Sequence, residues 1–455
     1  MTSLGDGLPV QQRRLAMATV VLAIAMATLD VAIANTALPT IATDLHATPE
    51  ASIWIVNAYQ LAMVATLMPL AAYGDIVGHR RVYIAGLILF TLASFACGVA
   101  WSLPSLIVAR ALQGLGAAGI LSVTNALIRF IYPSSQLGRA QGLNALTVAL
   151  FYVVGPTAAS GILSVGPWPW LFLINIPLGL VAIGLALATV PRNAGARATH
   201  TFDIAAAVLL GGMFALLILG LGEATHNARL IEVLVELVAA AMCCGLLLRR
   251  QRAHPAPLLA VDLLARPMFA LSIVTSICSY AAQGLAFVSL PFLFETVLGR
   301  SQVETGFLLT PWPVVVALMA PIAGRLSERH SVALLGGIGL VGLCIGMGLL
   351  ALLPAHATTA DIAWRLAICG AGFGFFQSPN LKALMTSAPR ERAGAASGMI
   401  PTARLLGQAL GAALVAACFT AFGDIGAITA LWIGCGFAGA AGVASLLRLY
   451  RGEMR

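Results

Sequence analysis

Charge is scarce in this chain, and its absence already excludes several classes of protein. Only 9% of the 455 residues are Asp, Glu, Lys or Arg, whereas a soluble domain carries about a quarter. The eight cysteines form no CxxC motif and all fall in apolar stretches, so we expect neither a disulfide framework nor a metal site. No histidine lies deep in an apolar stretch, and no nucleophile–base pair is recognisable. An enzyme is therefore not expected.

Hydrophobic residues make up 60% of the sequence and gather in fourteen stretches. Each stretch is about twenty residues long, which is the length a helix needs to cross a hydrocarbon core of about 30 Å. In lipid only helices and closed barrels satisfy every backbone hydrogen bond. The sequence therefore predicts an all-α polytopic membrane protein whose spans are residues 15–38, 51–73, 81–101, 105–130, 139–163, 170–190, 203–222, 230–248, 268–297, 303–325, 332–353, 361–386, 395–421 and 425–447.

The net charge of +8 is distributed by side of the membrane. If Arg13 and Arg14 are placed in the cytoplasm, nearly all other basic residues fall in inner loops, and the outer loops hold only Arg229 and Arg300. This is the positive-inside pattern of membrane proteins. It predicts that both termini are cytoplasmic and that the basic excess sets topology, so no nucleic-acid partner is expected.

An internal repeat divides the chain. Asp75, in a Gly-flanked loop, and Glu328, in a similar loop, are 253 residues apart, and Arg110 and Arg365 open similar segments at nearly the same offset. Two parallel six-span bundles with two spans inserted between them explain both matches. The predicted domains are residues 1–200, an inserted pair of spans at 201–250, and residues 251–455.

Several motifs occur in order along the whole chain: Leu29–Pro39, Gly74–Arg81, Arg110–Ala118, Gly155-Pro156, Trp168–Gly179 and Gln377–Asn380. Together they resemble the signatures of the fourteen-span drug:proton antiporters of the major facilitator superfamily. The resemblance implies the major facilitator fold and a proton-coupled antiporter that exports amphipathic, cationic drugs or toxic compounds by alternating access.

The same resemblance implies where the protein works and with what. It implies the bacterial inner membrane, a lipid surrounding, a functional monomer, and no cofactor, because the proton gradient is the energy source. A periplasmic adaptor partner stays open. So does a second function on the same fold, the export of an endogenous metabolite or lipid with drug efflux incidental.

Asp30 is the carboxylate that lies deepest in a predicted span, about 12 Å below its outer end. An ionisable residue at such depth costs at least a few kcal/mol and is a functional-site hypothesis by default. Arg110 lies at a similar depth in the fourth span, with Gln113 one turn further along the same face. We expect Asp30 to bind the proton and Arg110 and Gln113 to couple it to conformational change. The alternative is that these groups only anchor and pack helices.

A second set of residues is expected to act in gating. Asp75, Arg80 and Arg81 stand at the cytoplasmic end of the second span, where charges of both signs can clamp helix ends. Gly155 and Pro156 interrupt the fifth span. Topological anchoring alone is the alternative for the charged residues.

Substrate contacts are expected from Asp30 and from aromatic and polar residues of the spans. An aromatic-lined apolar cavity with one carboxylate suits hydrophobic cations, although any single aromatic residue can equally be a packing residue. The candidates are Asn35, Trp54, Tyr59, Tyr152, Tyr280, Gln283, Phe287, Trp312, Phe376, Gln377 and Arg404.

Overall fold

The computed structural model describes residues 7–133, 136–191, 202–223, 230–251, 261–354, 356–388 and 393–452. These residues form helices and contain no strand. The first group of helices is α1 (Val10–Thr36), α2 (Leu38–Asp44), α3 (Pro49–Ser52), α4 (Trp54–Val77), α5 (His79–Gly98), α6 (Leu103–Ile131), α7 (Leu137–Val165), α8 (Trp170–Leu173) and α9 (Asn175–Thr189).

Two further helices, α10 (Ile204–Glu223) and α11 (Leu230–Gln251), precede a second group. That group consists of α12 (Val261–Leu264), α13 (Pro267–Phe292), the π-helix η2 (Leu293–Val297), α14 (Gln302–Leu309), α15 (Pro311–Leu326), α16 (Val332–Ala351), α17 (Thr359–Ser387), α18 (Ala393–Phe422), the 3₁₀ turn η4 (Gly423–Ile425) and α19 (Gly426–Gly452).

The all-α architecture is confirmed, and helices cover each of the fourteen predicted spans. Within the described residues, eleven helical segments are long and apolar enough to cross a membrane. Of the other three predicted spans, α10 contributes a shorter apolar helix, and α11 and α17, with 22 and 29 residues, are not among the eleven. The count of fourteen membrane crossings therefore stays a prediction.

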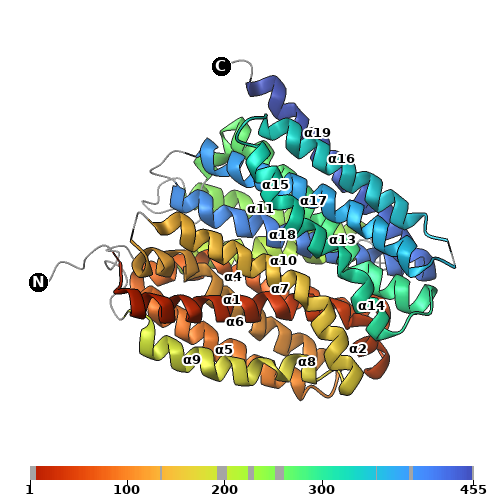
Figure 1. Ribbon diagram of the computed structural model, residues 1–455, viewed down its shortest axis with the longest axis horizontal. Coiled ribbons are helices and arrows are strands. Elements are labelled where there is room, and N and C mark those ends of the chain that lie inside the picture. Colours follow the sequence, from red (N-terminus) through yellow and green to blue (C-terminus); the bar gives the residue numbers. More distant parts are fainter. Residues whose placement is uncertain are drawn as a thin grey trace, which may run out of the picture.

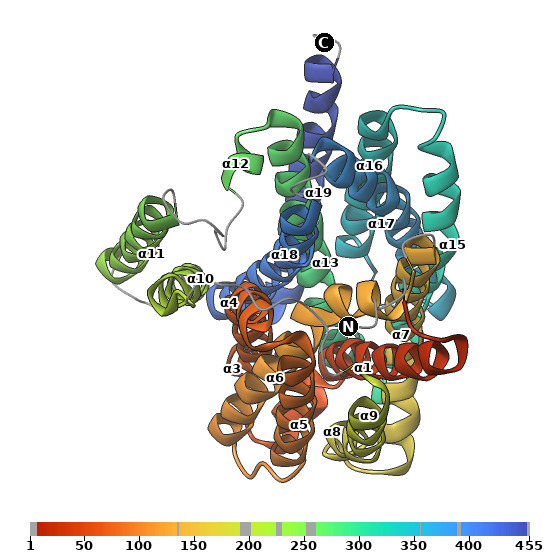
Figure 2. The ribbon, with the colours of Figure 1, turned by 90° about the vertical axis from the view of Figure 1, so that its left-hand side faces the viewer.

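The two groups of helices lie side by side with their long axes roughly parallel (Figure 1). Figure 2, a view along the helices, shows α1 and α3–α9 on one side and α13–α19 on the other, with α10 and α11 lying beside α4 and α18. The first described helix begins, and the last ends, at the same end of the molecule. The predicted domain boundary at residues 200 and 201 lies outside the described residues, and the division into domains stays a prediction.

Matching glycine contacts occur in both groups. A Cβ on Gly86 of α5 would lie 2.8 Å from the carbonyl oxygen of Gly116 in α6, and one on Gly339 of α16 would lie 2.6 Å from the carbonyl oxygen of Gly372 in α17. Small residues of this kind let membrane helices approach closely. The two contacts are 253 residues apart at Gly86 and Gly339, so the repeat seen in the sequence has a counterpart in packing.

The two groups touch each other at the end that the charge pattern places outside. There α14 packs on α7, α3 on α18, and α2 on α13. Thr157 of α7 and Thr310, at the end of α14, share a hydrogen bond of 2.9 Å. Gly306 of α14 is so close to α7 that a Cβ would lie 2.5 Å from the carbonyl oxygen of Pro156. The outer ends of the two groups are thus closed against each other.

Candidate functional site

Asp30 and Arg110 form a fully buried ion pair inside the first group of helices. Asp30, in the middle of α1, is 2% exposed, and Arg110 of α6 is 1% exposed. The Arg110 Nη1 donates to Asp30 Oδ2. Asp30 and Arg110 are far apart in the chain, so local sequence patterns do not show that they pair. The similar depths predicted for the two residues are consistent with the pairing.

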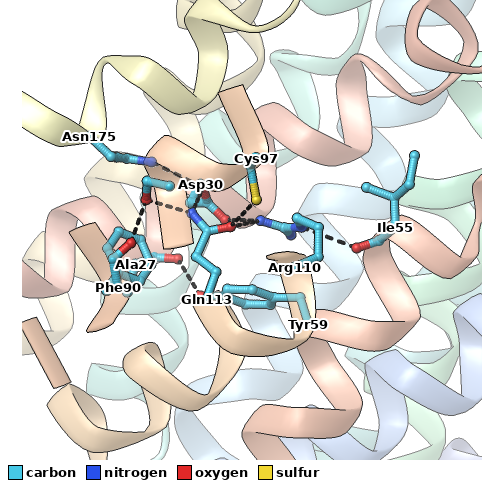
Figure 3. Close-up of polar contacts among 10 residues, drawn as sticks. Ala27, Asp30, Ile55, Tyr59, Phe90, Cys97, Arg110, Gln113 and Asn175 are labelled. Carbon is cyan, nitrogen blue, oxygen red and sulfur yellow. Dashed lines mark hydrogen bonds and ion pairs between the residues drawn. The ribbon is translucent and has the colours of Figure 1, made fainter. Parts of the chain in front are cut away.

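The second oxygen of the carboxylate is held by two amides (Figure 3). Asp30 Oδ1 accepts hydrogen bonds from Gln113 Nε2 at 2.8 Å and from Asn175 Nδ2 at 3.1 Å. Gln113 also accepts from Arg110 Nη1 at 2.6 Å and donates to Ser94 Oγ at 2.9 Å. Both oxygens of the carboxylate therefore have partners: Oδ2 is bound from α6, and Oδ1 is bound from α6 and α9.

The guanidinium of Arg110 is covered on its other sides by α4 and α8. Its Nε donates to the carbonyl oxygen of Ile55 at 3.1 Å. The rings of Tyr59 and Phe172 lie 4.3 Å and 5.5 Å from its Cζ atom. Such cation–π contacts stabilise a desolvated guanidinium. Tyr59, predicted to contact substrate, lies in this structure within the ion-pair cluster and is fully buried.

We call Asp30, Arg110, Gln113, Asn175 and Ser94 the charge cluster. Its hydrogen bonds lie within the first group of helices, and all except the one between Arg110 and Gln113 join two different helices. Loss of the carboxylate's charge would leave a buried guanidinium without its counter-ion, which is strongly unfavourable. A proton arriving at Asp30 would therefore disturb contacts to α4, α6 and α9 together.

The predicted gating charges lie at the inner end of the first group but do not pair with one another. The nearest basic partner of Asp75 is His79, with an Nε2–Oδ1 distance of 3.4 Å, and the Asp75 side chain is 60% exposed. Arg80 instead donates to the carbonyl oxygen of Leu187 in α9 at 2.7 Å, and Arg81 Nη1 lies 3.5 Å from the carbonyl oxygen of Val77. Between α4 and α5 the chain turns at Gly78, whose φ of +103° suits glycine.

Gly155 and Pro156 lie where α7 is enclosed between the two groups. A side chain at Gly155 would collide with Ala32 of α1, and the carbonyl oxygen of Pro156 faces Gly306 of α14. The helix continues through both residues, from Leu137 to Val165. This segment of α7 therefore touches both groups of helices.

Polar residues predicted to bind substrate meet where α7, α13 and α18 come together. Gln408 of α18 donates to Tyr152 Oη at 3.3 Å and to Gln283 Oε1 at 3.2 Å. Tyr280 accepts a hydrogen bond of 3.2 Å from Gln377. The Arg404 guanidinium is close enough to Tyr280 to interact with it electrostatically. Of these contacts, the bond between Gln408 and Tyr152 joins the second group to the middle of α7 in the first, and the others lie within the second group.

The remaining predicted substrate residues are more dispersed. Phe287 and Trp312 stack edge to face with centroids 5.3 Å apart, and Phe376 packs on Phe373 at 5.8 Å. Asn35 of α1 is buried, and its Oδ1 has no hydrogen-bond partner among the described residues. Trp54 begins α4 and is partly exposed.

Two features were not identified as functional from the sequence. Asn175 was noticed only within a motif, and Ser94 not at all, although both complete the charge cluster. A second buried network surrounds Arg448, near the end of α19. It is 1% exposed and donates to Asn380 at 2.8 Å and Ser272 at 3.0 Å. The apolar residues that flank Arg448 in α19 are the feature of the sequence that could have indicated its burial.

Known proteins resemble this chain in sequence and in fold. Residues 20–412 match the sequence model of the Major Facilitator Superfamily. The chain is 50% identical over 450 residues to the uncharacterized transporter YebQ of Escherichia coli (strain K12), covering 99% of this chain and 98% of YebQ.

More distant relatives are named for different substrates. The riboflavin transporter RibZ of Clostridioides difficile (strain 630) is 29% identical and covers 90% of this chain and 89% of its own length. The multidrug resistance protein Stp of Mycobacterium tuberculosis (strain CDC 1551 / Oshkosh) is 32% identical, covering 89% of this chain and 74% of its own. Among solved structures, a POT family transporter superposes with a TM-score of 0.72 at 14% identity, covering 96% of each chain, which shows likeness of fold.

Proposed function

The chain belongs to the major facilitator superfamily of membrane transporters, and we propose that it is a proton-coupled antiporter. It exports amphipathic, cationic compounds across the bacterial inner membrane by alternating access, with the proton gradient as its energy source. The observation that carries this proposal is the buried Asp30–Arg110 pair.

The pair provides a physical route from protonation to movement. In the structure Arg110 Nη1 contacts Asp30 Oδ2, so the ionised carboxylate would neutralise the guanidinium. Adding a proton to Asp30 Oδ2 removes the charge that Arg110 Nη1 binds, so the guanidinium must find another partner or move. Arg110 belongs to α6, and its guanidinium donates to the carbonyl oxygen of Ile55 in α4. A rearrangement of this guanidinium therefore alters how α4 and α6 pack.

The closed outer ends fit one stage of such a cycle. With α14 packed on α7 and α3 on α18, the described outer ends of the two groups are in contact. We assign this arrangement to the stage after proton release to the cytoplasm, when Asp30 is paired again and the protein awaits substrate from the inner side. Asp75 and the Gly155-Pro156 segment act in the transition between stages.

The class of substrate is inferred from the residues between the two groups. Tyr152, Tyr280, Gln283 and Gln408 offer hydroxyl and amide groups, whereas the rings of Phe287 and Trp312 are 8% and 1% exposed here and would contact substrate only after the groups move. Aromatic faces with few formal charges favour hydrophobic cations. With a single deep carboxylate, monocations should be exported better than dications. The relative Stp, named a multidrug resistance protein, supports this substrate class.

The test is drug-driven proton movement in proteoliposomes that hold a proton gradient. Addition of a lipophilic monocation such as ethidium should change the internal pH for the wild type and not for Asp30→Asn. Asp44→Asn, which makes the same carboxylate-to-amide change at an outer residue bonded to Trp168, is the matched control and should retain flux. Flux that persists in Asp30→Asn would place proton coupling elsewhere, with Glu236 the next residue to test.

Export of an endogenous metabolite is the second candidate. It is favoured by the relative RibZ, which is named a riboflavin transporter. If intact wild-type protein shows no proton flux with lipophilic cations but flux with neutral metabolites, the multidrug proposal fails and this one replaces it.

A further inference from the structure

The outer end of α13 leads into a π-helix that carries an acidic residue. Glu295 lies in η2, between Leu293 and Val297. Pro291, just before it, lacks a backbone N–H and so cannot continue the regular ladder. The wider turn is closed by a bond of 3.0 Å from the Leu298 nitrogen to the Leu293 carbonyl oxygen. Single π-helical turns are rare and occur frequently at functional sites.

The Glu295 carboxyl is partly buried without a partner. Its Oε1 is inaccessible to solvent and makes no hydrogen bond within the described part of the chain. The hydroxyl of Thr305, on α14, lies beside it and is close enough to interact with the carboxyl. None of the ion pairs among the described residues includes Glu295. A charged carboxylate in this position is costly, whereas a neutral acid is much less so.

Glu295 also lies where the two groups of helices meet at their outer ends. A cavity of about 510 Å³ is lined by Pro39 and Thr43 of α2, by Glu295 and Thr296, and by Arg300 to Val303. Residues of both groups thus form its walls. The cavity is open on one side, and Thr296 in its wall is exposed; separation of α2 from η2 and α14 would widen it and expose the buried oxygen of the carboxyl.

The charged groups around the cavity have other partners. Arg300 Nη2 donates to the carbonyl oxygen of Ala357 at 2.6 Å. Glu304 of α14 accepts from the backbone nitrogen of Ser301 at 2.9 Å. Asp44, at the end of α2, accepts from Trp168 Nε1 at 2.7 Å. The facing outer half of α7, residues 155–165, carries no charge. Arg300 Nε has no hydrogen-bond partner among the described residues, but Arg300 forms no ion pair with Glu295; a proton is the remaining way to neutralise the carboxyl.

We propose that Glu295 is a second proton-binding residue and that its protonation from the outer medium favours closure of the outer ends. This deepens the proposed antiport and rests on it, because a proton taken up from outside then promotes the inward-open stage. When the outer ends separate, water reaches the carboxyl and the ionised form is stabilised. When they close, the neutral form is favoured, and its hydroxyl can donate to Thr305.

This site differs from the charge cluster in place and in electrostatics. Asp30 is in the first group and is neutralised by Arg110, whereas Glu295 is in the second group at the outer boundary. Protonation of Asp30 removes its ion pair with Arg110. Protonation of Glu295 lowers the free-energy cost of burying its carboxyl.

The experiment measures the separation of the outer ends directly, without substrate. Spin labels are placed at Val165→Cys on α7 and Leu352→Cys beyond α16, which are 73% and 64% exposed, in a chain whose eight cysteines are replaced by alanine. The label-to-label distance is measured by electron resonance in lipid nanodiscs at a series of pH values. Glu295→Gln and Glu295→Asp are compared with wild type, and Glu50→Gln, an outer acid on α3, is the control.

Wild type and Glu50→Gln should shift toward the short distance as the pH falls. Glu295→Gln should show the short distance at every pH, and Glu295→Asp should keep a pH response with a displaced midpoint. A pH response that survives unchanged in Glu295→Gln, or a wild type without one, would overturn the proposal. Because no substrate is present, failure of drug-driven proton flux would be seen separately and would leave this result standing.

Discussion

Replacing Asp30 with asparagine keeps the shape of the side chain and removes its charge. Asparagine retains one acceptor oxygen for Gln113 or Asn175, whose bonds to Asp30 are 2.8 Å and 3.1 Å long. What it cannot replace is the counter-ion of Arg110, which is 1% exposed. Removing one member of a buried pair costs about 3–5 kcal/mol, because the other charge stays buried without compensation.

Contacts that Arg110 keeps reduce this loss only in part. The Ile55 carbonyl and the Tyr59 ring remain, and a desolvated cation–π contact contributes about 2 kcal/mol at most in either protein. We therefore expect Asp30→Asn to be less stable than wild type by about 3 kcal/mol or more. Thermal unfolding in detergent, followed by intrinsic fluorescence, should show a clear decrease in Tm.

A double variant separates the charge effect from a general packing effect. In Asp30→Asn/Arg110→Gln the uncompensated guanidinium is gone, so the Tm should rise above that of Asp30→Asn alone, while drug-driven proton flux stays absent. Asp44→Asn, which alters a carboxylate at the outer surface bonded to Trp168, is the control and should change Tm little. Equal Tm values for wild type and Asp30→Asn, or additive losses in the double variant, would refute the reasoning.

Three further substitutions test other parts of the structure. Asp75→Asn should change stability by less than about 1 kcal/mol, because the side chain is 60% exposed, yet lower the transport rate at normal membrane insertion; unchanged transport would contradict a gating role. Asn175→Ala removes one of the hydrogen bonds to Asp30 and should cost about 1 kcal/mol, with a smaller Tm decrease than Asp30→Asn. Gly306→Ala would place a Cβ 2.5 Å from the Pro156 carbonyl oxygen, so a membrane-impermeant probe should react faster with cysteines introduced at the outer ends; protection equal to wild type would argue against closure through this contact.

Local patterns predicted the helices well because hydrophobic length is a local property. Each of the fourteen predicted spans coincides with helix, although α10 contributes only a shorter apolar helix. Asp30 and Arg110 could be selected because a charge inside an apolar stretch is visible without any knowledge of packing. Asn175 and Ser94 could not, since neutral polar residues are common in spans and only their neighbours in space give them a role.

The gating and substrate predictions show the limit more clearly. Asp75, Arg80 and Arg81 are adjacent in sequence, yet the structure pairs Asp75 with His79 and directs Arg80 to α9. Tyr59 reads as a cavity aromatic and instead covers Arg110. The rotation of each helix about its own axis decides which residues a side chain contacts. That rotation depends on contacts with other helices, and these contacts cannot be read from the spacing of residues in the sequence.

The sequence by itself determined that this is a polytopic helical membrane protein of the major facilitator superfamily, since length, apolar content, charge asymmetry and ordered motifs are all properties of the linear chain. Only the tertiary structure decided that the deep carboxylate is neutralised inside one group of helices, that the outer ends are closed, and that Glu295 lies unpartnered at that closure. These depend on distances between residues far apart in the chain. Such distances are fixed when the helices pack, because ion pairing and burial act through space.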